Sequence, residues 1–219
     1  MVKIAAILFG ISTMLCASTA GERLEESALV LKEIMGTSDR SIPQDLLDKA
    51  HCIIVVPGMK KGAFIVGAKY GRGFMSCRKG HVGWSAPAGV RMEGGSFGFQ
   101  IGGSETDVIM LVLNETGAEK LMRSKFTLGG DASVAAGPVG RTTSAETDAL
   151  MRAEILSWSR TRGVFAGISL KGATMRPDKE VNSELYGKDL NNKEIIQSAE
   201  VPKAGSPLIA ELNKYSSRK

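Results

Sequence analysis

The sequence predicts an α+β protein with one large antiparallel sheet that can curl into a barrel, N-terminal helices before it and a helical C-terminal segment after it. Apolar residues recur at helical spacing near the N-terminus, and from residue 52 the pattern changes to β-type runs separated by Gly, Pro or charged turns. The 219 residues, of which 43% are hydrophobic, suffice for one buried core. We therefore expect a leader over residues 1–20, a single domain over 21–200 and a polar tail over 201–219.

Two helices are expected before the sheet. The first is an amphipathic helix over residues 22–35, because its apolar residues recur at spacings of three and four. These residues are Leu24, Ala28, Leu31 and Met35. Ser41 and Pro43 can begin a second, short helix that runs to Ala50.

The sheet is expected from six β-type runs, each bounded by turn residues. They are "CIIVVP", "GAFIVGAKYG", "GFMSCR", "VGWSAPAGVRM", "SFGFQIGG" and "DVIMLVLN". A short helix is expected over residues 115–124, and "EILSWSRTRGVFAGISLKG" predicts a hairpin that turns near Arg162-Gly163. Beyond Pro177 the chain is polar and predicted to be helical, with a loosely attached tail from Val201.

One short motif resembles a hydrolase nucleophile. Gly94-Gly95-Ser96-Phe97-Gly98 fits the pattern G-x-S-x-G, in which a serine sits on a sharp turn between a strand and a helix. Here the following residues alternate with a period of two, which indicates a strand, and both histidines precede Ser96. We therefore interpret Ser96 as a structural residue and predict no catalytic residue.

The cysteines leave three alternatives open. Removal of the leader would leave Cys52 and Cys77, which could form a disulfide in an oxidising compartment or remain buried thiols. His51 and His81 could complete a zinc site, but adjacent strand residues point to opposite faces, so His51 and Cys52 do not converge easily. We predict no metal and no cofactor, and we keep the cysteine pair as the disulfide candidate.

The N-terminus has the layout of a secretory signal peptide. One positive charge at Lys3 precedes an apolar run from Ile4 to Leu15, and the small residues Ser18 and Ala20 follow. The run is too short to span a bilayer comfortably, although an uncleaved membrane-proximal helix is the alternative. We expect cleavage after about residue 20 and an exported protein, either periplasmic or secreted.

Positive charge is concentrated in residues 51–100. This window has seven basic residues and one acid, a net charge of +6, whereas the whole chain carries +5 and the remainder therefore −1. The basic residues are Lys60, Lys61, Lys69, Arg72, Arg78, Lys79 and Arg91. Several fall at predicted turns and could gather at one end of the sheet to attract phosphate or an anionic surface. Export and the scarcity of aromatic residues argue against nucleic acid as the polyanion.

Five long segments together resemble the SYLF domain, a lipid-binding family found in eukaryotes and bacteria. They are "KKGAFIVGAKYGRG", "GWSAPA", "GGSFGFQIGGSETDVIMLVLN", "KFTLGGDASVAAGPVGR" and "AEILSWSRTRGVFAGISLKGA", within roughly residues 25–190. The resemblance implies binding of phosphoinositide or another anionic lipid, with actin regulation in some eukaryotic members. Several glutamates on the first predicted helix disfavour docking of that helix on an anionic bilayer, so the seven basic residues are the lipid-binding candidates.

The sequence thus predicts an exported, non-enzymatic SYLF-like domain whose partner is an anionic phospholipid or membrane surface. An export signal and the lack of an SH3 or FYVE extension argue against actin as a partner. The alternative is an envelope structural or stress-related module that binds another protein and no lipid. An enzyme ranks third, because clusters of His, Asp and Cys are scarce.

Overall fold

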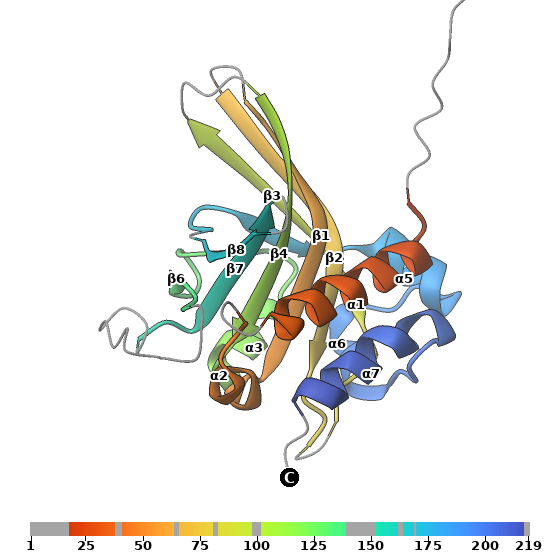
Figure 1. The fold of residues 1–219 in the computed structure, drawn as a ribbon. Coiled ribbons are helices and arrows are strands. Elements are labelled where there is room, and N and C mark those ends of the chain that lie inside the picture. The colour runs from red at the N-terminus through yellow and green to blue at the C-terminus, as the bar shows by residue number, and fades with distance from the viewer. Residues whose placement is uncertain are drawn as a thin grey trace, which may run out of the picture.

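The computed structural model describes residues 18–216 except 38–40, 64–65, 81–82, 98–101, 139–151, 162–163 and 169. It is an α+β fold in which helices pack on a large, curled half-barrel sheet (Figure 1). The strands are β1 (Cys52–Ala63), β2 (Val66–Cys77), β3 (Ala88–Phe97), β4 (Gly102–Val112), β5 (Phe126–Thr127), β6 (Val134–Ala136), β7 (Ile155–Thr161), β8 (Val164–Gly167) and β9 (Thr174–Pro177). The helices are α1 (Ala20–Gly36), α2 (Gln44–Lys49), α3 (Glu115–Leu121), α5 (Lys179–Tyr186), α6 (Asn192–Ser198) and α7 (Ser206–Tyr215), with a 3₁₀ turn at Lys203–Gly205.

The sheet has the order β5-β9-β3-β2-β1-β4-β7-β6, and β8 pairs with β7 beside β6. All pairs are antiparallel except β6 with β7. The expected hairpin is present, because Thr161 and Val164 end β7 and begin β8 as antiparallel neighbours.

The strand that begins with "CIIVVP" continues to Ala63 because a bulge, and not a turn, follows Val56, and the run "GAFIVGAKYG" is divided between the end of β1 and the start of β2. The register of β1 shifts by one residue against both β2 and β4 between Val56 and Met59. Gly58 adopts a left-handed φ of 55° there, a conformation that suits glycine. Gly73 faces the same bulge, and a Cβ on it would lie 2.7 Å from the Val56 Cα, so only glycine fits.

The long strands bury apolar side chains on both faces. Ile53 and Val55 point toward the cluster that includes Leu24 and Leu31 of α1. Ile54 and its alternate neighbours join a second cluster on the opposite face, with residues of α6 and of the segment 126–134. Burial on both faces explains why these strands are continuous apolar runs.

The C-terminal segment differs from the loosely attached tail that the sequence predicted. Leu208 and Leu212 of α7 are fully buried in the cluster that contains α1, and α7 lies beside α1 (Figure 1). Two other differences are local: residues 83–87 are not in a strand, and "SFGFQIGG" is divided between the end of β3 and the start of β4. None of the helices within the described part of the chain is both long and apolar enough to cross a membrane.

Candidate functional site

Five of the seven predicted basic residues lie on the adjacent strands β1, β2 and β3, and the other two, Arg78 and Lys79, follow β2. Lys60, Lys61 and Lys69 belong to the half of the β1–β2 pair near its connection at residues 64–65. Arg78 and Lys79 follow the other end of β2, about ten residues from Lys69, which corresponds to roughly 30 Å along a strand. Three of the seven predicted residues therefore lie near one end of the sheet, and the other four do not join them.

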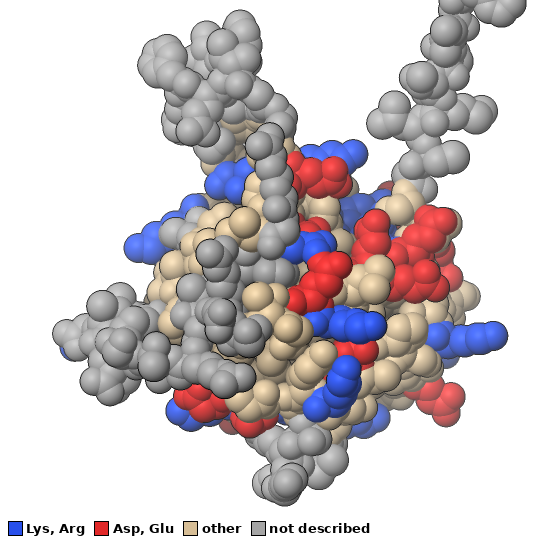
Figure 2. All heavy atoms as spheres, in the orientation of Figure 1, with Lys and Arg blue, Asp and Glu red and all other residues tan. Residues whose placement is uncertain are grey.

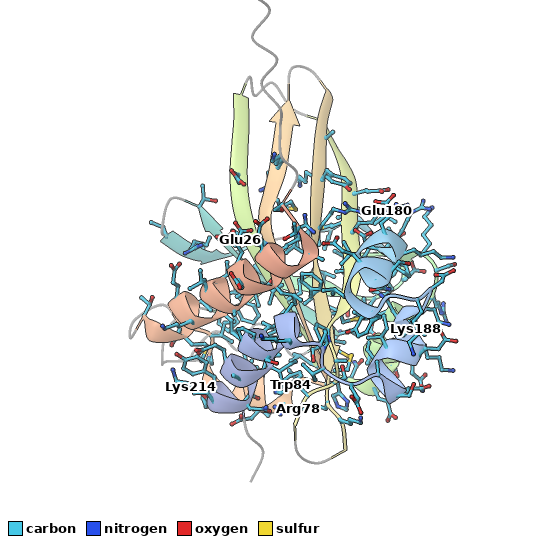
Figure 3. All side chains as sticks on the ribbon, turned by 90° about the vertical axis from the view of Figure 1, so that its right-hand side faces the viewer. Glu26, Arg78, Trp84, Glu180, Lys188 and Lys214 are labelled. Carbon is cyan, nitrogen blue, oxygen red and sulfur yellow. A yellow bond between two sulfur atoms is a disulfide. The ribbon has the colours of Figure 1, made fainter. Side chains whose placement is uncertain are left out.

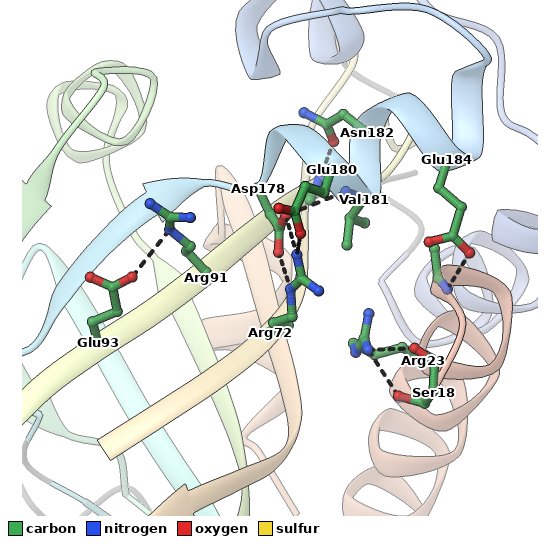
Figure 4. Close-up of polar contacts among 12 residues, drawn as sticks. Ser18, Arg23, Arg72, Arg91, Glu93, Asp178, Glu180, Val181, Asn182 and Glu184 are labelled. Atoms are coloured by element: carbon green, nitrogen blue, oxygen red, sulfur yellow. Dashed lines mark hydrogen bonds and ion pairs between the residues drawn. The ribbon is translucent and has the colours of Figure 1, made fainter. Parts of the chain in front are cut away.

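Arg72 is held by a buried carboxylate. Its Nε and Nη2 donate to the two carboxylate oxygens of Asp178 at 2.5 and 2.8 Å, and Nη2 also reaches Glu180 at 2.6 Å (Figure 4). The side chain of Asp178 is 1% exposed and that of Arg72 is 25% exposed. The hydrogen bonds to Asp178 raise the pKa of Arg72 further above its usual range. This arginine joins β2 to the start of α5.

Arg78 joins the sheet to the C-terminal helix. Its Nη1 donates to the carbonyl of Ser216 at 2.5 Å, and Nη2 donates to the hydroxyl of the same serine. The guanidinium also lies 4.1 Å from the centre of the Trp84 ring, and the two residues meet at the lower end of the sheet near α7 (Figure 3). Arg78 is thus part of the packing of α7.

Arg91 has a weaker, more exposed partner. Its Nε lies 3.2 Å from Glu93 on the same strand, and both side chains are 40% exposed (Figure 4). Arg176 of β9 lies 3.8 Å from the same carboxylate. The two arginines therefore share one acid on the outer part of β3 and β9.

The four predicted lysines differ from the three arginines in their surroundings. Within the described ranges, none of Lys60, Lys61, Lys69 and Lys79 makes an ion pair. Lys60 lies opposite Glu105 of β4, with Tyr70 on its other side, whereas Lys61 lies directly opposite Lys69. Burial, followed by the charge of Lys69, lowers the pKa of Lys61.

The cysteine pair is a disulfide in the structure. Cys52 and Cys77 lie opposite each other at the ends of β1 and β2, and their sulfurs are bonded. No group of three or more potential metal ligands occurs among the described residues, and His81 of the zinc alternative lies outside them. The disulfide forms part of the wall of a cavity of about 530 Å³ between the sheet, α3 and α6.

Ser96 lies within β3, where it pairs with Gly67 of β2. The next described element after β3 is the strand β4, and no helix occurs between them in the described residues. The backbone arrangement therefore differs from a nucleophile elbow.

An acidic cleft beside α1 was not predicted from the sequence. It has a volume of about 330 Å³ and lies between the outer side of α1 and the bulge of β1. Its lining includes Glu26, Leu29, Glu33, Gly58, Glu105, Asp107 and Arg160. Acidic side chains gather over α1 in the space-filling view (Figure 2). Leu29, which also lines the cleft, is 54% exposed. The glutamates noted on this helix in the sequence indicated its negative charge. The cleft itself was not predictable, because α1 and the β1 bulge are far apart in sequence.

Arg160 crosses the base of this cleft. It pairs with Asp107 at 2.6 Å and with Glu33 of α1. Burial raises the pKa of Asp107, although the N–H of Gly58 donates to this carboxylate at 2.8 Å and acts in the opposite direction. These contacts tie α1 to β4 and β7.

Comparison with known proteins identifies relatives over most of the chain. The family Ysc84, described as "Las17-binding protein actin regulator", matches residues 93–215. The SH3 domain-containing YSC84-like protein 1 of Xenopus laevis is 33% identical over 170 residues, which is 75% of this chain and 50% of that protein. The protein YSC84 of Saccharomyces cerevisiae is 30% identical over 176 residues, 78% of this chain and 37% of that protein. This chain thus spans half or less of the length of these relatives.

Proposed function

Since the chain belongs to the Ysc84 family, whose domain is also called SYLF, we propose that it is a non-catalytic module that binds anionic phospholipid, phosphoinositide-like or other, or an anionic membrane surface. The observation that carries the proposal is a set of three lysines near the connection of β1 to β2 that make no ion pair with any described residue: Lys60, Lys61 and Lys69. Each lysine near an anionic surface contributes about 1 kcal/mol, so three lysines at the same end of the sheet suffice for weak, reversible attachment.

The experiment is co-sedimentation with vesicles of phosphatidylcholine, with and without phosphatidylglycerol, over a series of salt concentrations. Binding should require the anionic lipid and weaken as salt shortens the Debye length to about 8 Å at physiological ionic strength. Reversal of Lys60, Lys61 and Lys69 to Glu should abolish binding. The matched control reverses three exposed lysines elsewhere, Lys188, Lys193 and Lys203. Equal losses in the two triple variants would mean that only net charge matters.

The absence of catalysis is part of the proposal. The family's description concerns actin regulation and binding to Las17, the name of the Xenopus laevis relative concerns an SH3 domain, and neither describes an enzyme. The strand position of Ser96 supports the same view. Ser96→Ala should leave any detectable activity intact, and a turnover that disappears with this change alone would contradict a purely binding role.

We further propose that the protein is exported after removal of residues 1–20, as the apolar run before Ser18 suggests. The Thr19 hydroxyl accepts the Glu22 N–H at the start of α1, and Arg23 donates to Ser18 (Figure 4). Cleavage would remove this N-cap, at a cost of about 1 kcal/mol. The apolar face of α1 is buried, so the helix should persist.

A protein partner without a lipid ligand is the second candidate, as expected of an envelope structural or stress-related module. The acidic cleft beside α1 favours it, because an exposed Leu29 surrounded by carboxylates suits a basic, apolar segment. The vesicle experiment separates the two candidates, since a module of this second kind would not sediment with anionic vesicles. Actin regulation is stated in the family's description, but we do not propose actin as a partner of an exported chain.

A further inference from the structure

We propose that Lys61 and Lys69 form a cradle for the phosphate monoester of a lipid headgroup, on the face of the β1–β2 pair opposite α1. The inference rests on the proposed function and makes it more specific. It selects two of the seven predicted basic residues and one class of headgroup.

The register of the sheet brings these two lysines together. They are a directly opposed pair, and such pairs have Cβ atoms about 4.5–5.5 Å apart on the same face. Both lysines lie on the face of the sheet that packs against α6. Lys61 is two residues after Met59, which is buried on that face. Lys69 is two residues before Gly71, which pairs with Met92 of the same buried cluster. The bulge at Gly58 produces this arrangement, since it shifts β1 by one residue and places Lys61 on that face.

The neighbours of the pair in the sheet carry no charge. On the adjacent strands, Lys69 lies opposite Gly94 of β3, and Lys61 lies opposite Ser104 of β4. The next row toward the strand ends holds the uncharged residues Ala63, Gly67 and Gly102, and Lys61 and Lys69 are themselves only partly buried.

The charge of the pair is not compensated within the protein. The nearest acids on these strands, Glu93 and Glu105, occupy the adjacent row with Lys60 and therefore point to the other face. Among the described residues neither Lys61 nor Lys69 has an ion-pair partner. Like charges that face each other across two strands repel, and the pKa of Lys61 is lowered first by burial and then by this repulsion. An anion between the two ammonium groups would relieve the repulsion.

The chemistry of two opposed lysines favours a phosphate monoester over a diester. A monoester carries a charge of about −1.5 to −2 at neutral pH and three acceptor oxygens, so that each ammonium group can donate to its own oxygen. A phosphodiester, as in phosphatidylglycerol, carries a single charge. Lysine acts as a point charge without a preferred plane, so recognition here depends on the number of charges and not on a bidentate geometry.

The test compares vesicles of phosphatidylcholine with either phosphatidic acid, a monoester, or phosphatidylglycerol, a diester, at matched surface charge. The wild-type protein should bind the monoester vesicles more tightly. Lys61→Gln with Lys69→Gln should weaken that binding about 30-fold, from about 1 kcal/mol per lysine. The control Lys79→Gln with Lys188→Gln removes the same charge from two exposed lysines outside the proposed site, and it should lose much less. Lys61→Arg with Lys69→Arg keeps both charges and should retain binding.

Several results would overturn the inference. If both vesicle types bind alike and the two double Gln variants behave alike, the inference is wrong although the proposed function stands. If no anionic vesicle binds even at low salt, both are wrong. Soluble glycerol 3-phosphate distinguishes the source of the phosphate: binding of this probe that depends on Lys61 and Lys69, without binding to phosphatidic acid vesicles, would show a soluble ligand instead of a lipid. Urea unfolding of each variant checks that a loss of binding does not reflect a loss of fold.

Discussion

Replacement of Arg72 by Met is expected to lower the free energy of unfolding by about 3 kcal/mol while leaving vesicle binding of the folded protein unchanged. Arg72 makes two hydrogen bonds to Asp178, whose carboxylate is 1% exposed. Without the guanidinium, this carboxylate would keep only the N–H of Val181 at 3.3 Å among its hydrogen bonds from the described residues. Removal of one partner of a buried pair costs about 3–5 kcal/mol. We take the lower end because a quarter of the Arg72 side chain is exposed to solvent.

The assay is urea unfolding, where the midpoint should fall without a change in slope. For a protein of this size the loss corresponds to a decrease in Tm of roughly 6–12 °C. Arg91→Met is the matched control, because its pair with Glu93 is 40% exposed on both sides and should contribute less than about 1 kcal/mol. Arg72→Met with Asp178→Asn should cost less than the sum of the single changes, since the second change removes the unpaired charge.

Two outcomes would refute this reasoning. If Arg72→Met costs no more than Arg91→Met, the contact with Asp178 does not stabilise the fold. If Arg72→Met removes vesicle binding at full stability, Arg72 belongs to the lipid site as the sequence suggested. Both measurements use the same purified variant, so stability and binding can be separated directly.

Three further predictions concern the disulfide, the bulge and export. Reduction of the Cys52–Cys77 bond, which closes a loop with a sequence separation of 25, should cost about 3 kcal/mol in urea unfolding, and an unchanged midpoint with dithiothreitol would contradict this. Gly73→Ala should destabilise by about 1–3 kcal/mol because its Cβ overlaps the backbone of β1, whereas Gly62→Ala, with nothing within 4 Å of its Cβ, should cost far less; equal costs would be evidence against the tight contact. Mass spectrometry of the native protein should find an N-terminus near Gly21, and a full-length chain in the cytoplasm would exclude export.

Local sequence patterns predicted most helices and strands, but they did not predict contacts between residues that are distant in sequence. The spacing of apolar residues identified α1 closely, and the alternation around Arg162-Gly163 identified the β7–β8 pair. Pro57-Gly58 was interpreted as a turn because both residues favour turns, and only pairing with two neighbouring strands distinguishes a turn from a bulge. Leu208 and Leu212 recur at helical spacing in α7, so the helix itself was predictable; its docking on α1 was not.

The sequence predicted the sign of the charge at the candidate site but not the arrangement of its side chains. A count of charges correctly located positive residues between 51 and 100, yet it could not distinguish a paired side chain from an unpaired one. Asp178, the partner of Arg72, lies 106 residues away in sequence. The acidic cleft beside α1 likewise combines α1 with β4 and β7, which no local pattern connects.

The chemical type of each basic residue carried information that total charge did not. The three arginines of the predicted set have carboxylate, carbonyl or aromatic partners, which suits a planar guanidinium with five donors, whereas none of the four lysines makes an ion pair within the described ranges. A variant that reverses Arg78 together with lysines would mix two effects, because loss of Arg78 also releases the C-terminal end of α7 at Ser216. Reduced vesicle binding by such a variant could then arise from a loosened helix. Exchanges of lysines alone avoid this ambiguity, and for an arginine variant such as Arg72→Met a change in vesicle binding can be interpreted only when its stability is measured on the same sample.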